Sequence, residues 1–521
     1  MLFRSNNIGG GYSYVGVFPN TTPESWNQSG DARTRVSGIT HELGHNFGLQ
    51  HQATYDQWGT LTAEYASQKD ALHGPLMGVD YSGTVHKFIL GHNSTSTGGT
   101  TLQDDVAVIA GKIKTYQPAG GDGFRTDDFG NTIATATALP VSGAAQWTSA
   151  VIERLNDVDA FSFVVNAGGV YAISAAPDTP SGVDLKLEIY ASDGTLVAAK
   201  DGANNVQELT MNLGVGTYYA LVSSHQNYGD LGRYFISVSA LPAGWQSVDV
   251  GLGTSGYTVY DSATGIFNPV GSGINPGGSG GGLSGTSDGF QYAYQSLTGD
   301  GAIVARVANV DNTSAEALVG VTIRESTAAN SPQVSVAKTY GGGPKRFYRS
   351  TAGGSTTTTS AAALNVNDTW VKLQRVGNVF TSFTSSDGVT WTPLSTGVTV
   401  TMASTVTVGL LTASANRHAM NVGELDNVTV TGNTGISPPV YNSLSAPTGL
   451  AVALGTGSGL NLSWNAVSGA TGYAIDRSTD GVNFTQIGTT ASLSYSDPGL
   501  VGSARYFYRV SATDVAGRSV P

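Results

Sequence analysis

The chain of 521 residues contains no cysteine, and only 12% of its residues are charged. The absence of cysteine excludes a disulfide framework and thiolate catalysis, but an exported protein can also lack cysteine. Lys and Arg number 25 against 37 Asp and Glu, and they form no cluster. We therefore expect no nucleic-acid partner, because such partners require concentrated positive charge. No apolar run reaches the roughly 18 residues of a membrane-spanning helix, so no membrane span is expected.

Glycine is abundant, with 70 positions, and it is accompanied by many Ser, Thr, Val and Tyr residues. This composition predicts many short strands joined by turns. At about 100–200 residues per domain, the length indicates three to five domains. The pattern divides the chain into four segments, which are residues 1–116, 124–241, 245–432 and 446–521.

The first segment holds six of the eight histidines and the helical periodicity. Apolar residues recur at helical spacing over 106–113, and Thr101 is the expected N-cap of that helix. Residues 117–123 have the composition of a linker. In the later segments the apolar period changes to two, for example over 185–189, which predicts β-sandwiches.

The stretch from His41 to His51 carries the pattern of a catalytic zinc site. His41 and His45 lie four residues apart on a predicted helix, so their rings share one face. Gly48 allows a sharp left-handed turn that returns His51 as a third ligand. Three protein ligands leave a fourth position for water, whose pKa zinc lowers to about 7. Glu42 is then the expected general base for that water.

The competing interpretation is that these are ordinary surface histidines on an amphipathic helix. A bare His-Glu-x-x-His motif arises often by chance. The extended form fixes five positions within eleven residues, which makes a chance match improbable and favours the zinc site.

The same eleven residues resemble the metzincin metallopeptidases. In that family a methionine turn lies beneath the zinc, and Met77 occupies the corresponding place here. Some members have a tyrosine two residues after that methionine, which approaches the zinc and stabilises the oxyanion. Tyr81 follows Met77 by four residues instead and is a candidate for that role. The resemblance implies an α+β catalytic unit, of which only 40 residues precede His41, so the N-terminal part is expected to be missing.

The remaining segments resemble accessory modules of secreted bacterial proteins. Residues 127–240 resemble pre-peptidase C-terminal domains, some of which bind calcium. Asp157 and Asp159 are candidate Ca²⁺ ligands, although solvated turn carboxylates are the alternative. Residues 245–432 resemble laminin-G or concanavalin-like sandwiches. Residues 446–521 resemble a fibronectin type III domain that lacks its last strand.

The expected fold is a truncated α+β metzincin unit followed by three all-β sandwich domains. The expected function is a secreted zinc-dependent endopeptidase that acts on a protein or peptide substrate. Its sandwich modules would tether it to a polysaccharide or cell-surface polymer. The alternative is an adhesion or glycan-binding protein with an incomplete or inactive peptidase unit. The first residues have no signal peptide, and we expect that one was lost by truncation.

Overall fold

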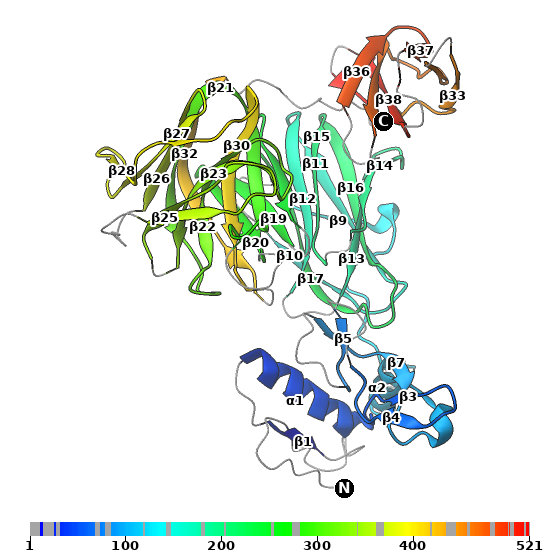
Figure 1. The fold of residues 1–521 in the computed structure, drawn as a ribbon. Helices are drawn as coiled ribbons and strands as arrows, with labels where there is room; N and C mark the ends of the chain where they lie inside the picture. The colour runs from blue at the N-terminus through cyan, green and yellow to red at the C-terminus, as the bar shows by residue number, and fades with distance from the viewer. Residues whose placement is uncertain are drawn as a thin grey trace.

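The computed structural model shows a small helix-containing unit followed by a long series of β-sheets (Figure 1). Neither of the two α-helices among the described residues is long and apolar enough to cross a membrane. The structure describes residues 11–13, 25–27, 32–67, 73–78, 85–117, 120–141, 147–178, 183–202, 205–251, 255–273, 282–340, 342–360, 369–416, 419–433, 444–455, 459–479, 485–498, 500, 505–514 and 517–519.

The first unit contains helices α1 (Ala32–Phe47) and α2 (Asp105–Lys114) and the 3-10 turn η1 (Thr97–Gly99). Its described strands pair only two by two, and one pair, β5 with β6, is parallel. The pairs are β1 (Gly11–Ser13) with β2 (Ser25–Asn27), β3 (Thr54–Tyr55) with β4 (Leu61–Ala63), β5 (His73–Pro75) with β6 (Val85–Lys87), and β7 (Leu90–His92) with β8 (Leu102–Asp104).

The expected α+β metzincin unit is therefore wrong for the described residues. Such a unit needs one twisted sheet against which its helices pack, whereas here the strands form separate two-stranded pairs. Thr101 is also not the cap of α2. The segment after it is used by β8, so the helix begins only when Asp104 accepts a hydrogen bond from the backbone N–H of Ala107.

Two sheets follow and enclose a common apolar core. The first has the order β10 (Thr148–Ile152), β17 (Gly232–Ala240), β12 (Gly169–Pro177), β15 (Gln207–Leu213). The second has the order β14 (Leu196–Lys200), β13 (Leu185–Ala191), β16 (Gly216–Ser224), β11 (Val158–Val165), β9 (Thr137–Ala138), and η2 (Ile133–Thr135) precedes it. The expected alternation is confirmed in β13, where Leu185, Leu187 and Ile189 are buried and their neighbours are not.

The next sheet is a 15-stranded network that folds over on itself. Its main path is β19 (Gly256–Asp261), β20 (Ile266–Gly271), β32 (Glu424–Asn433), β21 (Phe290–Asn309), β30 (Thr405–Ala413), β22 (Leu318–Arg324), β23 (Gln333–Thr339), β24 (Pro344–Arg349), β25 (Thr357–Ser360). The side members are β18 (Gln246–Val250), β26 (Trp370–Val376), β27 (Val379–Ser385), β28 (Thr392–Pro393), β29 (Val398–Thr399) and β31 (Asn421–Val422). Strand β21 pairs with β18 and β30 in its first half and with β26 and β32 in its second, so it joins both layers of a sandwich.

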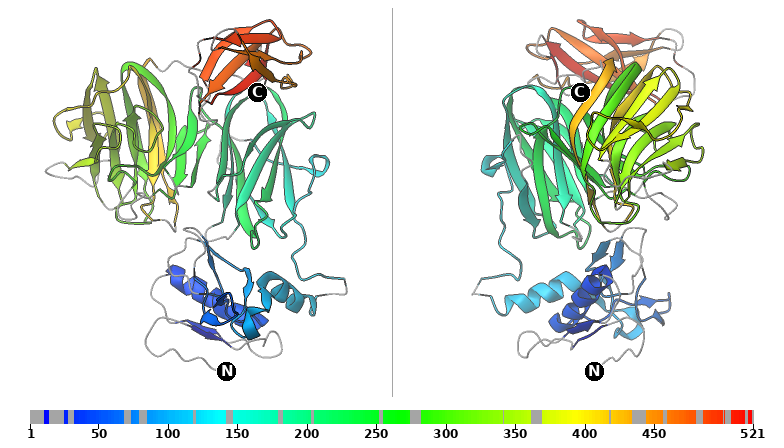
Figure 2. Two further views of the ribbon diagram at one scale, coloured as in Figure 1. Left: turned by 45° about the vertical axis from the view of Figure 1, so that its right-hand side comes forward. Right: turned by 90° about the vertical axis from the view of Figure 1, so that its left-hand side faces the viewer.

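These two β-bodies lie side by side, in cyan to green and in green to yellow (Figure 2). Val170 and Ala172 of β12 share one apolar cluster with Leu241 and Trp245 of the connecting segment. The buried carboxyl of Glu208 in β15 also reaches across to β19 and β21. The contact between the bodies is thus both apolar and hydrogen-bonded.

The last residues form a sandwich of three and four strands, with Trp464 and Tyr473 in its core, as the sequence predicts. The expectation that the final strand is absent is wrong, because β39 pairs with β38. The two sheets are β33 (Ala451–Leu454), β34 (Leu460–Ser463), β37 (Ser494–Asp497), and β36 (Thr485–Thr490), β35 (Gly472–Ser478), β38 (Phe507–Asp514), β39 (Gly517–Arg518). This architecture is that of immunoglobulin-like and fibronectin type III sandwiches.

Candidate functional site

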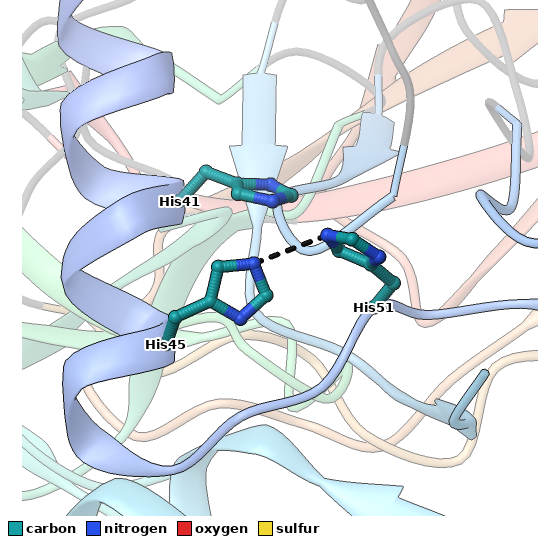
Figure 3. Close-up of side chains that lie close together, drawn as sticks. All are labelled: His41, His45 and His51. Carbon is teal, nitrogen blue, oxygen red and sulfur yellow. Dashed lines mark hydrogen bonds between the residues drawn. The ribbon is translucent and has the colours of Figure 1, made fainter. Parts of the chain in front are cut away.

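Three histidines converge at the C-terminal end of α1. His41 and His45 project from the helix toward His51, which follows the turn after it (Figure 3). Their ring centroids are 4.8–5.3 Å apart, and each ring offers a nitrogen within 4.8 Å of the other two. The spacing of the histidines in the sequence therefore does bring the three predicted ligands together.

Each ring has its other nitrogen committed to an oxygen. The Nδ1 atoms of His41 and His45 lie 2.7 Å from the carbonyl oxygens of Leu76 and Leu49. His51 Nδ1 lies 3.1 Å from a carboxylate oxygen of Glu64. Because these oxygens only accept, each Nδ1 donates its proton, and each Nε2 keeps its lone pair. This is the arrangement that orients histidine for a metal ion.

The histidines are held in the neutral form that a metal requires. Burial and then the charge of His45 lower the pKa of His41 to about 3 and that of His51 to about 4. Burial also lowers the pKa of His45. Metal ligation needs unprotonated imidazole, so at neutral pH the site loses no affinity to proton competition.

The geometry passes a test for zinc. Nε2 of His45 lies 3.1 Å from Nε2 of His51. With Zn–N distances of about 2.0–2.1 Å, the nitrogens of a tetrahedral site lie about 3.3 Å apart. The donor set of three imidazoles also suits zinc. When bound, zinc would supply a Lewis acid and a water of lowered pKa at its open position.

Glu42 follows the first ligand on α1, and its side chain is buried beside the histidines. Burial raises the pKa of its carboxyl to about 7. Near neutral pH the group therefore exists in both protonation states, which suits a residue that accepts a proton and returns it. Its role as a general base stays a prediction.

Gly48 and Met77 fix the position of His51. Gly48 has a φ of 107°, and its N–H donates to the carbonyl of His45 as the helix ends. Gly44 packs directly on Met77, so that a Cβ at position 44 would lie 2.5 Å from the methionine sulfur. Met77 is fully buried, and its carbonyl accepts from the N–H of Gln52, next to His51. The methionine thus packs against α1 between His41 and His45 in sequence, at Gly44, and its role as an apolar floor under a metal stays a prediction.

Tyr81 lies outside the described residues. Sequence reasoning missed two residues on the other side of the site, Glu64 and Tyr65. Glu64 holds His51, and the ring of Tyr65 packs against that of His51 with centroids 4.2 Å apart. Both belong to the segment after β4, and only the fold brings them to the histidine. His92, in β7, packs against Tyr55 and is not a member of the three-histidine cluster.

A second candidate metal site lies at the edge of the first β-sandwich. Asp127, Glu153 and Asp157 bring carboxylate oxygens within 4.8 Å of one another. Among the described residues, both carboxylate oxygens of Glu153 are buried without a hydrogen-bond partner. Asp157, one of the two candidate Ca²⁺ ligands, is thus a member of this cluster, and its binding of calcium stays a prediction. Asp159 instead accepts a hydrogen bond of 2.7 Å from the hydroxyl of Tyr234.

Burial and mutual repulsion raise the pKa values of these carboxyls. Burial, followed by Asp157 and the other neighbouring carboxylates, raises the pKa of Glu153 to about 8. Burial likewise raises the pKa of Asp159 to about 8. Arg125 lies 3.8 Å from Glu153 but is mostly exposed, so it offsets little of this cost. Oxygen ligands in such a cluster suit calcium, and Asp127 and Glu153 were missed because neither stands within the acidic stretch around Asp157.

Comparisons with known proteins find matches to short parts of the chain. No family model matches it. It is 42% identical over 78 residues to a poly(3-hydroxybutyrate) depolymerase of Ralstonia pickettii, covering 15% of each chain. It is 34% identical over 127 residues to exoglucanase B of Cellulomonas fimi, covering 23% of this chain and 11% of that one. A solved Fn3-like protein of Clostridium thermocellum is 37% identical, with 15% of this chain and 84% of that chain covered and a TM-score of 0.14. The chain therefore spans only a small fraction of the curated relatives it matches.

These findings correct two expectations. The assignment to the metzincin metallopeptidases is wrong, because the curated relatives are a depolymerase and a glucanase by name and no peptidase family model matches. The expected zinc metalloendopeptidase activity is wrong for the same reason. The chain is a multidomain β-sandwich protein that shares segments with polymer-degrading enzymes.

Proposed function

We propose that this chain is an extracellular protein that binds a polysaccharide or a related polymer surface through its β-sandwiches. The observation that carries the proposal is the pair of relatives, which share segments of 78 and 127 residues with this chain. By name, one degrades a polyester and the other a glucan, so their chemistries differ. Short segments shared with enzymes of different chemistry are best explained as accessory modules, and both enzymes, by name, act on a polymer.

The proposal includes two metal sites. The site of His41, His45 and His51 holds Zn²⁺, with Glu42 placed for proton transfer beside it. The cluster of Asp127, Glu153 and Asp157 holds Ca²⁺ and stabilises the first sandwich. Support comes from the geometry of both clusters and from the unpartnered oxygens of Glu153.

Sedimentation with insoluble polymers tests the polymer-binding function. The full chain is mixed with cellulose, starch, chitin or poly(3-hydroxybutyrate) granules, and the protein left in solution is measured. We expect depletion by at least one polymer, and the same depletion for His51→Ala, because binding belongs to the sandwiches. Full recovery of the wild-type chain from all four supernatants would contradict the proposal.

A further inference from the structure

A cavity of about 330 Å³ opens where the segment after β17 meets β19, β20, β21 and β32. Its wall contains three aromatic rings in contact. The rings of Trp245 and Tyr260 both pack on Phe267, with centroids 4.6 and 4.5 Å away. Its volume lies at the lower end of the roughly 300–1,000 Å³ typical of small-molecule sites. It is separate from both metal clusters.

The polar groups of the cavity are uncharged and include unused hydrogen-bonding capacity. None of the residues that line it is Asp, Glu, Lys, Arg or His. Within the described part of the chain, neither the indole N–H of Trp245 nor the carboxamide of Gln295 has a hydrogen-bond partner. An indole donates only, whereas a carboxamide both donates and accepts. The cavity therefore offers both kinds of hydrogen bond to a neutral ligand.

The backbone of β32 is distorted at this cavity. Val304 pairs with Thr429 and Arg306 with Asp426, so Asn427 and Val428 together stand opposite one residue of β21. Asn427 has a φ of 50°, a left-handed conformation that few residues other than glycine adopt. Such bulges redirect side chains and concentrate next to functional sites. Both bulged residues line the cavity, and exposed Asn427 stands at its rim.

The opposite rim is held in place by the turn between β19 and β20. Asp261 accepts hydrogen bonds from the N–H of Ala263 and the hydroxyl of Thr264, at 2.9 and 2.8 Å. Gly265 completes the turn with a φ of 75°. Because both rims are ordered before any ligand arrives, binding would cost little conformational entropy.

We infer that this cavity binds one neutral sugar ring of a polysaccharide. A pyranose has an apolar face of C–H groups, which fits the aromatic wall, and a rim of hydroxyls that donate and accept like the carboxamide of Gln295. A polyester segment only accepts hydrogen bonds, so it would leave the carbonyl oxygen of Gln295 unpaired. A charged sugar would find no counter-charge. This inference rests on the proposed function and identifies the polymer class and the site.

Three variants test the cavity in the full chain. Gln295→Ala and Trp245→Phe remove hydrogen-bonding groups, and Asn427→Gly removes a rim side chain while keeping the left-handed backbone. Gln374→Ala in β26, which lies outside the cavity, is the matched control. Binding of cellohexaose, maltohexaose and chitohexaose is measured by calorimetry, and the unfolding temperature of each variant confirms that it folds.

We expect one oligosaccharide to bind the wild-type chain and the control equally. Each cavity variant should bind it about three- to tenfold more weakly, the worth of one neutral hydrogen bond. Equal binding by all variants, or attachment to polyester granules without oligosaccharide binding, would overturn the inference while leaving polymer binding intact. If no polymer binds in sedimentation, the proposed function fails. Calorimetry then still tests the sugar site. Oligosaccharide binding that the cavity variants weaken would support the site, and the absence of oligosaccharide binding would overturn it.

Discussion

His45 and His51 hold their Nε2 atoms 3.1 Å apart while the Nδ1 of each ring donates to an oxygen, of Leu49 and of Glu64. Two lone pairs therefore face each other in a buried site, which is unfavourable without a proton or a cation between them. The lowered pKa values of both rings argue against the proton. A metal ion that accepts both lone pairs, as we propose for this site, would remove this repulsion.

We therefore predict that the purified chain binds about one Zn²⁺ at this site, as three imidazoles and an open position suit zinc. His51→Ala should lose it, because two ligands on one helix turn cannot hold the ion tightly. Elemental analysis after dialysis measures the ratio, and Co²⁺ substitution reports tetrahedral geometry by its absorption. His225→Ala is the control, because His225 follows β16 and pairs with Asp201 and not with the histidine cluster. Zinc retained by His51→Ala as fully as by wild type would refute the ligand assignment.

Glu64→Gln should weaken zinc binding about 10–100-fold, the usual effect of removing a partner that orients a ligand. The carboxylate of Glu64 accepts the Nδ1 proton of His51, and an amide does so with less charge. Competition with a chromogenic chelator measures the affinity. Glu316→Gln changes an exposed residue between β21 and β22 of the 15-stranded sheet; it is the matched control and should bind zinc as wild type does. An unchanged affinity for Glu64→Gln would show that the contact does not orient His51.

The clustering of His41, His45 and His51 could be predicted from the sequence because the geometry that brings them together is local. The spacing of one helix turn places His41 and His45 on the same face, and the turn at Gly48 brings His51 back toward them. The same local pattern says nothing about the rest of the unit, so the expected α+β metzincin unit was wrong. Glu64 was missed because it approaches His51 only through the pairing of β3 with β4.

The carboxylate cluster shows the same limit. Asp157 was identified from an acidic stretch, but Asp127 and Glu153 join it only when separate segments of the sandwich pack together. Thr101 was wrong as a helix cap because pairing of β7 with β8 uses that segment first. The alternation in β13 was predictable, since a strand with one buried face must repeat every two residues. The four domain boundaries stay predictions.

Calcium should raise the unfolding temperature of the chain, because it would neutralise carboxyls that repel one another and are partly buried. Without calcium, the pKa of Glu153 is about 8 in the folded state against an ordinary value of 4.5. Between these values the folded state holds more protons than the unfolded one, so stability falls as pH rises from about 4.5 to about 8. The pKa of Asp159 is raised in the same way, so it contributes to stability with the same pH dependence.

Thermal unfolding in a chelator should thus show a lower midpoint at about pH 8 than at about pH 5.5, and calcium should reduce this difference. Glu153→Gln should abolish most of the response to calcium. Measuring all samples in the His51→Ala background separates this effect from loss of zinc. If Glu153→Gln left the response to calcium unchanged, calcium would bind at a different site.

Glu208→Ala should loosen the contact between the two β-bodies. The carboxyl of Glu208 accepts from the N–H of Thr258 at 2.7 Å, from the side-chain amide of Gln291 at 3.1 Å and from the hydroxyl of Ser174 at 3.4 Å. Alanine would remove the acceptor of Thr258 and Ser174, at about 1–3 kcal/mol for each donor that cannot find water. The amide of Gln291 would keep its hydrogen bond to Ser247. Burial raises the pKa of Glu208. Glu208→Gln keeps a side-chain oxygen that can accept these hydrogen bonds, so it should be more stable than Glu208→Ala.

Chemical denaturation and limited proteolysis near Trp245 would measure the effect of Glu208→Ala. Glu188→Ala is the matched control, because its half-exposed pair with Lys186 is worth at most about 1 kcal/mol. We expect faster cleavage of the connecting segment in Glu208→Ala alone. That segment carries Trp245 and so forms part of the cavity wall. If Glu208→Ala were as stable and as protease-resistant as wild type, the two bodies would be held by apolar contacts alone, and the cavity would not depend on this network.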